Sequence, residues 1–421
     1  MKLKQVLVAL AALATVIAVE ADGATLSVDR VKQRYPWNGL VDIDYTISVD
    51  DNVTFGPDDN LEVLMVDKSV TPAVTNRAVR FQQVPLPMTA GRHRITWLAN
   101  DDGVTTCTDN AEFHVKVVHY AEAYMVIDVS RGSNETTYPV DFVTGVPASY
   151  FNTEEYKTGK IVLRRIHQGS YVAGSPKNEA YRAKASGDET QHYVTLTKPF
   201  YIGIFEITAK QYQNVMGAYP GTNLGDTYPA GAVPWNTVKD NFVTKLSNKC
   251  KSKASGSGDY AVAVTGFDLP TEAQWEYACR AGTTKAFNGS DDFDNTKTDE
   301  LDKQISLLGR YKGNAKGEHN PDLAIVGSYL PNAWGLYDMH GNAWELCRDW
   351  WGATQAGTVA TEWQHLVDPT GPSSAGWGSY KVKRGGCCVS LTEACRSAYR
   401  STAPTATAGG DYGFRIILPL P

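Results

Sequence analysis

The sequence predicts an α+β chain in which a small all-β sandwich domain precedes a larger, irregular α+β domain. At 421 residues the chain is too long for one ordinary hydrophobic core. Short runs of alternating apolar and polar residues fill the first part, whereas the second part combines short strands and helices with long loops. We expect four segments: 1–23 as a signal peptide, 24–120 as the sandwich, 121–159 as a connector and 160–421 as the second domain.

Composition and charge argue against two classes of protein. Hydrophobic residues make up 42% and charged residues 20% of the chain, as in an ordinary soluble globular protein. The formal net charge of −6 argues against nucleic acid as a partner, because nucleic-acid-binding domains normally carry a basic patch. Beyond the N-terminus no segment is apolar enough to be transmembrane, so we expect no membrane span.

The N-terminus has the pattern of an export signal. Lys2 and Lys4 precede an uncharged run over residues 6–19, which is too short to span a bilayer and ends in small and polar residues. We therefore expect a cleaved signal peptide over residues 1–23. The mature protein is then secreted or periplasmic, in a compartment where disulfides can persist.

Residues 24–120 contain strand-like runs at roughly even spacing. Apolar and polar residues alternate in "LVDIDYTISV", and "HRITWLA" and "AEFHVKVVHY" follow stretches rich in turn-forming residues. This spacing is typical of a small β-sandwich. No group of chemically reactive residues stands out there, so we expect the domain to serve for spacing, docking, or contact with protein or carbohydrate.

Capping residues predict two helices in the second domain. Thr208 is placed to cap the N-terminus of the first helix, which ends at Gly217. In the second helix Thr271 and Gln274 fit a capping box, and Gly282 fits the end. About a hundred loop-rich residues follow, which is unusual for a compact domain unless its fold is irregular by nature.

Six segments of the second domain occur in an order that is found in a known family. They are "GSYVAGSP", "KPFYIGIFEITAKQYQNVMG", "LPTEAQWEYACRAGT", "NAWGLYDMHGNAWELCRDWW", "RGGCCVSLTEACRSAYRS" and "DYGFRIIL". From about residue 160 to 418 the chain thus resembles the formylglycine-generating enzyme (sulfatase-modifying factor) family. The resemblance implies an irregular, C-type-lectin-like fold with little regular secondary structure, which accounts for the long loops.

The resemblance also implies a copper site, which this sequence does not complete. The family's founding members oxidise a sulfatase cysteine to formylglycine with copper held by two thiolates, and Cu(I) prefers sulfur ligands. Counted from "GG" at 385–386, the first thiol position is Ser390 and the second is Cys395. Counted backward from the downstream motifs, Cys395 becomes a framework residue. Both counts predict that the two-thiol site is not intact.

The neighbouring cysteines leave two alternatives open. On a strand, Cys387 and Cys388 would point to opposite faces, so at most one of them could join Cys395 in a redox or copper pair. Otherwise one of the two packs as a small apolar residue, and Cys395 bonds elsewhere, with Cys347 as a possible partner. The chain has seven cysteines, an odd number that leaves at least one thiol without an intramolecular partner.

A calcium site is implied by the resemblance of "YDMHGNAWE" to the family's calcium-binding turn. There Asp338, Gly341 and Ala343 would offer backbone oxygens and Glu345 its carboxylate, the oxygen ligands that Ca²⁺ prefers. The alternative is that Glu345 pairs with an arginine.

Other positions are assigned by the same resemblance. Trp344 and Cys387 are expected in the substrate cleft, with a buried core position as the alternative for Trp344. Three arginines are expected to bond buried carbonyls or carboxylates, for which a guanidinium is well suited; they are Arg396, Arg400 and Arg415. The histidine spacing of the family's iron-dependent relatives is absent, so we expect no iron site.

Two functions from different classes follow. The first is a secreted family member without copper chemistry that serves as a binding or scaffold module for an exported protein or a glycan, with calcium as a structural ion. The alternative is a copper-dependent formylglycine-generating oxidase that acts on a sulfatase peptide.

Overall fold

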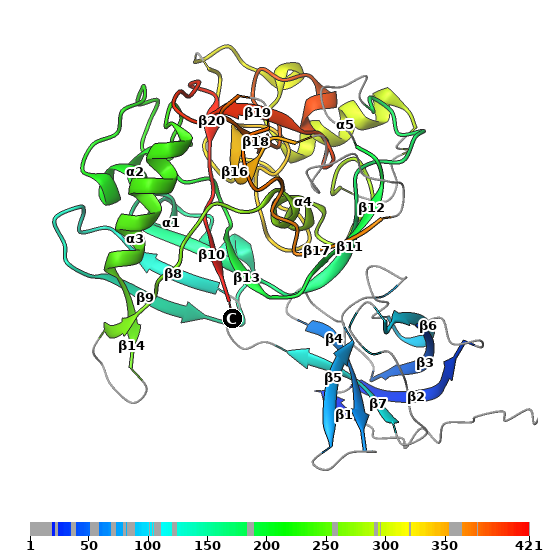
Figure 1. Ribbon diagram of the computed structural model, residues 1–421. Helices are drawn as coiled ribbons and strands as arrows, with labels where there is room; N and C mark the ends of the chain where they lie inside the picture. The colour runs from blue at the N-terminus through cyan, green and yellow to red at the C-terminus, as the bar shows by residue number, and fades with distance from the viewer. Residues whose placement is uncertain are drawn as a thin grey trace, which may run out of the picture. The chain divides into compact units, whose positions relative to one another are not determined.

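The computed structural model divides into two compact units, residues 1–121 and 122–421 (Figure 1). The structure describes residues 19–21, 24–34, 39–50, 59–68, 73–78, 81, 89–100, 102, 104, 111–119, 124–182, 189–254, 260–289, 294, 296–319, 321–352, 364–376 and 378–420. Most of the expected signal peptide lies outside these residues, although Val19–Ala21 forms strand β1. None of the described helices is long and apolar enough to cross a bilayer.

The first unit consists, in its described residues, of two antiparallel sheets that share one core. One sheet has the order β1-β2-β3-β6 and the other β5-β4-β7. Alternation along β3 buries Val41, Ile43 and Tyr45, which pack with Val63 of β4 and Trp97 of β6. The predicted all-β sandwich is thus confirmed. Its further strands are β2 (Ala24–Gln33), β3 (Leu40–Val49), β4 (Asp59–Asp67), β5 (Val74–Ala78), β6 (Gly91–Leu98) and β7 (Ala111–His119).

The second unit is built on a seven-stranded sheet of order β15-β14-β9-β8-β10-β13-β21. Strands β8 and β9 lie in the segment that was expected to be a connector, and β8 pairs with β10 inside this unit. The sheet therefore includes the first and the last described strand of the unit. Its strands are β8 (Tyr124–Asp128), β9 (Tyr138–Val143), β10 (Lys160–Ile166), β13 (Phe200–Gly203), β14 (Cys250–Lys253), β15 (Tyr260–Ala263) and β21 (Ile417–Pro419).

Two smaller sheets complete the second unit. A three-stranded sheet has the order β11-β12-β17, and a four-stranded sheet has the order β19-β18-β16-β20. The strands are β11 (Gly169–Ala173), β12 (His192–Leu196), β17 (His365–Val367), β16 (Trp344–Trp350), β18 (Tyr380–Arg384), β19 (Ser401–Pro404) and β20 (Tyr412–Gly413). Short helices and long loops join these small sheets, so the expected irregular α+β fold is confirmed.

The two predicted helices begin as their sequences indicate. Thr208 accepts a hydrogen bond from the backbone of Gln211 at the start of α2, and Thr271 does the same for Gln274 at the start of α4. The helix α4 lies against β11, β16 and β18, and most of its residues are buried (Figure 1). The α-helices are α1 (Glu154–Thr158), α2 (Ala209–Met216), α3 (Val243–Lys249), α4 (Glu272–Arg280) and α5 (Thr298–Leu308), and a 3₁₀ helix spans Thr392–Cys395.

Candidate functional site

The adjacent cysteines lie in a turn that follows β18. The strand ends at Arg384, and Gly385 and Gly386 both take positive φ angles of 91° and 76°, which a β-strand does not allow. The turn is then fixed by two backbone hydrogen bonds, from Cys388 N to Asn342 O (2.8 Å) and from Ser390 N to Cys387 O (2.9 Å). The expectation that the two cysteines continue a strand and point to opposite faces is therefore wrong.

Two polar side chains lie beside the sulfur of Cys387. Its Sγ lies 3.2 Å from Ser390 Oγ and donates to Asp411 Oδ2 at 3.2 Å. The adjacent Cys388 is the main cause that lowers the pKa of Cys387, and Ser390 acts in the same direction, while burial and Asp411 oppose them. The turn thus favours the thiolate of Cys387.

Trp344 is connected to Cys387 through Asp411. The backbone N–H of Trp344 donates to Asp411 O at 2.9 Å, while the carboxylate of Asp411 accepts from Cys387. The Trp344 ring covers the amine of Lys383, whose Nζ lies 4.5 Å from the ring centroid and 2.9 Å from Tyr412 Oη. Burial lowers the pKa of Lys383 to about 8. The two residues expected in a substrate cleft are therefore brought together, although both are largely buried.

Cys395 lies in a hydrophobic cluster. It ends the 3₁₀ helix Thr392–Cys395, and burial raises the pKa of its thiol well above the ordinary value. Its neighbours in the cluster are Ala286, Phe287, Leu301, Ile305, Leu308 and Tyr311. All six cysteines of the described residues are free, so the structure contains no bridge between Cys395 and Cys347.

The residues at the family's copper position do not fit a Cu(I) ion. One position holds the hydroxyl of Ser390, which is a poor ligand for Cu(I), and the other holds the apolar-packed thiol of Cys395. Among the residues that the structure describes, no three or more His, Cys, Asp and Glu side chains are placed to share one metal ion.

Glu345, the carboxylate expected to bind calcium, is bonded to an arginine. Its Oε1 accepts from Arg415 Nη2 at 2.6 Å, and its Oε2 accepts from Arg415 Nε at 2.6 Å and from Trp275 Nε1 at 2.7 Å. The arginine that was the alternative partner of Glu345 is thus in place. Both oxygens of Glu345 are thus hydrogen-bonded within the protein.

Two further buried carboxylates surround this ion pair. Glu206 accepts from Asn342 Nδ2 at 2.8 Å and from Ala343 N at 3.0 Å. Asp338 accepts from Gly327 N at 2.6 Å, whereas its Oδ1 has no hydrogen-bond partner. Burial is the main cause that raises the pKa of both carboxyls. Asp338 Oδ1 is therefore the oxygen of this carboxylate cluster that could bind a cation. Glu206 was not predicted from the sequence, although it is a lone acidic residue in the apolar run "FYIGIFEI".

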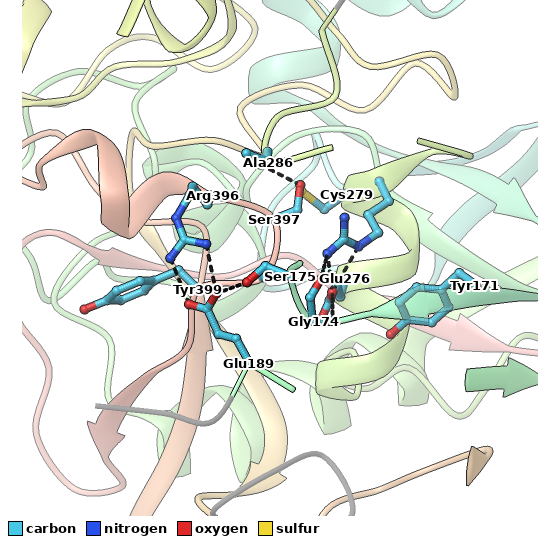
Figure 2. A network of polar contacts seen from close by, with 12 residues as sticks. Tyr171, Gly174, Ser175, Glu189, Glu276, Cys279, Ala286, Arg396, Ser397 and Tyr399 are labelled. Atoms are coloured by element: carbon cyan, nitrogen blue, oxygen red, sulfur yellow. Dashed lines mark hydrogen bonds and ion pairs between the residues drawn. The ribbon is translucent and has the colours of Figure 1, made fainter. Parts of the chain in front are cut away.

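A network of buried ion pairs holds the segment after the turn (Figure 2). Arg396 donates to Glu179 Oε1 at 2.7 Å and to both oxygens of Glu189 at 2.8 and 2.9 Å. Ser175 donates to Glu189 at 2.6 Å. Arg280 of α4 contributes a second pair with Glu276 at 2.8 Å. The Arg396 contacts anchor the segment to the stretch between β11 and β12, while the Arg280–Glu276 pair lies within α4.

The predicted role of the other arginines agrees with the structure. Arg400 donates to both carboxylate oxygens of Glu272, and Arg415 donates to the backbone oxygens of Gly203 and Tyr337 as well as to Glu345. His340 is also buried, and its Nδ1 donates to Cys395 O at 2.8 Å. The buried charges of these arginines are thus paired with carboxylates and hydrogen-bonded, as the cost of desolvation requires.

Comparisons with known proteins match most of the second unit to one family. Residues 150–420 match the family described as the sulfatase-modifying factor enzyme 1-like domain. The formylglycine-generating enzyme of Streptomyces coelicolor is 36% identical over 295 residues, which are 60% of this chain and 87% of that protein. The solved structure of PvdO from Pseudomonas aeruginosa is 26% identical, covers 62% of this chain and 94% of that chain, and superposes with a TM-score of 0.46.

A relative with a different name shares part of the domain. The serine/threonine-protein kinase pkn1 of Chlamydia pneumoniae is 33% identical over 160 residues, which are 38% of this chain. This chain spans 22% of the length of that relative.

Proposed function

Because the chain belongs to the sulfatase-modifying factor enzyme 1-like family, we propose that it is a member without copper chemistry that serves as a binding or scaffold module. The observation that supports this proposal is the pair of residues at the family's thiol positions. Ser390 supplies a hydroxyl where a thiolate is needed, and Cys395 is enclosed by apolar side chains. A Cu(I) centre needs two thiolates that can approach the same ion.

The architecture around the turn suits binding. Buried ion pairs of Arg384 before the turn and of Arg396 after it fix the segments on both sides, so the surface of the turn is presented on a rigid support. Val389 and Leu391 on this surface are 56% and 55% exposed. Relatives with unrelated names, a protein kinase and a formylglycine-generating enzyme, share parts of this domain. This supports the proposal that the domain is not tied to one reaction and can serve as a binding module.

The partner that we propose is an exported protein or a glycan. The support is the N-terminal sequence, whose two lysines and apolar run have the pattern of a signal peptide, and we propose a secreted or periplasmic location on this ground. Screening of the purified chain against glycans and exported proteins tests this proposal. A ligand should lose at least about tenfold in affinity for Val389→Asp, since a charge would replace apolar contact at the surface; an unchanged affinity would place the binding face elsewhere.

The enzymatic alternative is a formylglycine-generating oxidase that acts on a sulfatase peptide. It is favoured by the extent of the match to the enzyme of Streptomyces coelicolor. To separate the two functions, the chain is loaded with Cu(I), bound copper is measured, and aldehyde formation is followed on a sulfatase-derived cysteine peptide. We expect neither stoichiometric copper nor aldehyde. Stoichiometric Cu(I) together with turnover that is lost in Cys395→Ser would overturn our proposal.

We also propose Ca²⁺ as a structural ion of the carboxylate cluster, with Asp338 in place of Glu345 as the side-chain ligand. The support is the surplus of carboxylates over guanidinium groups around Arg415 and the unpartnered Asp338 Oδ1. Oxygen ligands of this kind suit a hard cation. The test is the melting temperature of the chain in calcium against that in a chelator.

A further inference from the structure

The outer face of one sheet in the first unit carries rows of charged side chains that the proposed binding surface at Val389 does not include. On β3, Val41 and Ile43 are buried in the core, so the alternate residues Asp42 and Asp44 lie on the outer face. Strand β3 is flanked by β2 on one side and by β6 on the other. The outer face is thus formed by three neighbouring strands with β3 in the middle.

The register of the strands places cations on both sides of these aspartates. Asp44 lies opposite Arg30 of β2 and Arg94 of β6, and Asp42 lies opposite Lys32 of β2. Neighbouring strands are about 4.8 Å apart, so the two rows of cations are separated by about 10 Å. Along each strand, residues on the same face recur about every 7 Å. The face therefore presents a line of carboxylates between two lines of cations.

The cations of this face outnumber its carboxylates. Three arginines each form an ion pair with an aspartate of the face; the pairs are Arg34–Asp42 at 2.9 Å, Arg94–Asp44 at 2.8 Å and Arg92–Asp29 at 3.6 Å. Arg30 and Lys32 are exposed as well, and no carboxylate of the described residues lies within ion-pair distance of either. On a chain whose net charge is −6, this face thus holds an excess of positive charge.

The ion pairs hold the face in a fixed arrangement and still leave donors free. Arg34 donates to both oxygens of Asp42, at 2.9 and 3.1 Å, and Arg94 donates to both oxygens of Asp44. Bidentate pairs restrict the rotation of the side chains, so less conformational entropy is lost when a ligand binds. Arg34 and Arg94 remain 41% and 60% exposed, so part of each guanidinium group is open to a ligand.

An acidic polysaccharide has the chemistry that this arrangement recognises. Its carboxylate or sulfate groups would accept hydrogen bonds from the two rows of cations. Its hydroxyls would donate to the aspartates between the rows, because an ionised carboxylate is an acceptor only. The hydrogen bond from Arg94 is the main cause that lowers the pKa of Asp44, and the charge of Arg30 acts in the same direction, so Asp44 is ionised at neutral pH.

The same arrangement disfavours two other anionic partners. A nucleic-acid duplex has closely spaced phosphates, which would lie over the aspartates of β3 as well as over the cations. A membrane surface is bound more strongly when apolar side chains insert beside the cations. The outward residues of β3 from Asp42 to Ser48 are aspartate, threonine and serine, none of which could insert.

We propose that the outer face of β2, β3 and β6 binds an acidic polysaccharide, with Arg30 and Lys32 as the main contacts of its acid groups. The excess charge selects an anionic polymer, and the aspartates between the cations select one that also carries hydroxyls. The inference concerns the first unit alone. It does not rest on the surface at Val389, so either proposal can fail without the other.

The test titrates the native full chain with three polysaccharides that share one backbone: dextran, carboxymethyl dextran and dextran sulfate. We expect binding to an acidic polymer, with an affinity that falls as sodium chloride is added, and none to neutral dextran. The two acidic polymers show whether carboxylate or sulfate is preferred. Binding to dextran as tight as to the acidic polymers, or no binding to either acidic polymer, would overturn the proposal.

Duplex DNA and vesicles of phosphatidylserine and phosphatidylcholine are titrated in parallel at the same concentration of acid groups. Both should bind more weakly than the preferred acidic polysaccharide, because neither offers hydroxyls in place of part of its acid groups. Tighter binding of DNA or of the vesicles would assign the face to that class of partner and would refute our proposal.

Charge-reversal variants locate the binding face, and circular dichroism checks their folding. Arg30→Glu combined with Lys32→Glu should lower the affinity for the acidic polymer at least about tenfold at low salt, since two attractive contacts become repulsive. The matched control is Lys297→Glu combined with Lys303→Glu, which changes the net charge equally at side chains that are 64% and 61% exposed on another part of the chain. The control should change the affinity less than about twofold. An equal loss in both double variants would show that only net charge matters, contrary to the proposal.

A variant of the central strand separates recognition from general attraction between charges. Asp44→Ala makes the face more positive, so attraction alone would strengthen the binding of the acidic polymer. We expect a weaker affinity instead, because the variant removes an acceptor for hydroxyls and releases Arg94 from its position. A gain in affinity would contradict the role that we assign to the aspartates.

Discussion

Replacement of Arg396 by methionine should destabilise the second unit severely, because it would leave two buried carboxylates without their cation. Arg396 is fully buried and forms ion pairs with Glu179 at 2.7 Å and with Glu189 at 2.8 Å, the second of which is drawn in Figure 2. Removal of one partner of a buried ion pair costs about 3–5 kcal/mol, since the remaining charge stays desolvated. We expect a loss of this size in the free energy of unfolding of Arg396→Met.

The pH dependence of the stability of Arg396→Met gives a second, independent test of this ion-pair argument. In the wild type, burial raises the pKa of Glu179, whereas the bonds from Arg396 outweigh burial and lower that of Glu189. The wild-type contribution of Glu189 is therefore present above the unfolded pKa and is lost as the pH falls through the folded pKa. Without Arg396 burial dominates at both carboxyls, so their folded pKa rises and stability should fall as the pH increases above the unfolded value.

Urea unfolding at several pH values measures both effects. The matched control is Lys303→Met, which removes a helix-surface pair with Glu300 at 3.0 Å whose lysine is 61% exposed, and it should cost less than about 1 kcal/mol. Glu189→Gln in the Arg396→Met background should recover part of the lost free energy of unfolding, because it removes one buried charge that has no partner. A loss below about 1 kcal/mol in Arg396→Met, or the same slope against pH as in the wild type, would refute the reasoning.

Three further predictions concern other parts of the second unit. Burial lowers the pKa of His340 to about 4, so the free energy of unfolding should rise with pH between about 4 and 6.5 as the unfolded histidine releases its proton; an unchanged slope in His340→Gln would contradict this. Asp338→Asn should abolish the rise in melting temperature that calcium gives the wild type, and a rise that survives in the variant would exclude Asp338 as a ligand. Thr271→Ala should cost about 1 kcal/mol in chemical unfolding, because it removes the bond that caps α4, and a loss below about 0.3 kcal/mol would show that the cap is dispensable.

The sequence predicted the local features of the second unit well. The caps at Thr208 and Thr271 depend on residues three positions apart, and such spacing is readable along the chain. The buried roles of Arg396 and Arg415 were also predicted, from the resemblance to the family and because a guanidinium is suited to bonding several buried acceptors.

The partners of these residues could not be predicted, because they are distant in the chain. Glu189 lies 207 positions before Arg396, and Glu206 lies 136 positions before Asn342. One sequence holds no signal for such pairing. The turn at Cys387 did have a local signal, since two consecutive glycines interrupt a strand, and this signal was outweighed by the expectation that the strand continues.

The order of the seven-stranded sheet has a consequence for biosynthesis. Its first strand in the chain, β8, is separated from β21 by β10 and β13, and β21 comes from the last described residues. The strand that pairs with β13 and the arginine that pairs with Glu345, Arg415, both lie in residues 415–419. They are therefore present only after these residues have been synthesised. A nascent chain that ends before them would hold an open strand edge and an unpaired buried carboxylate, both of which favour aggregation. Release from chaperones should therefore depend on the completion of the last strand.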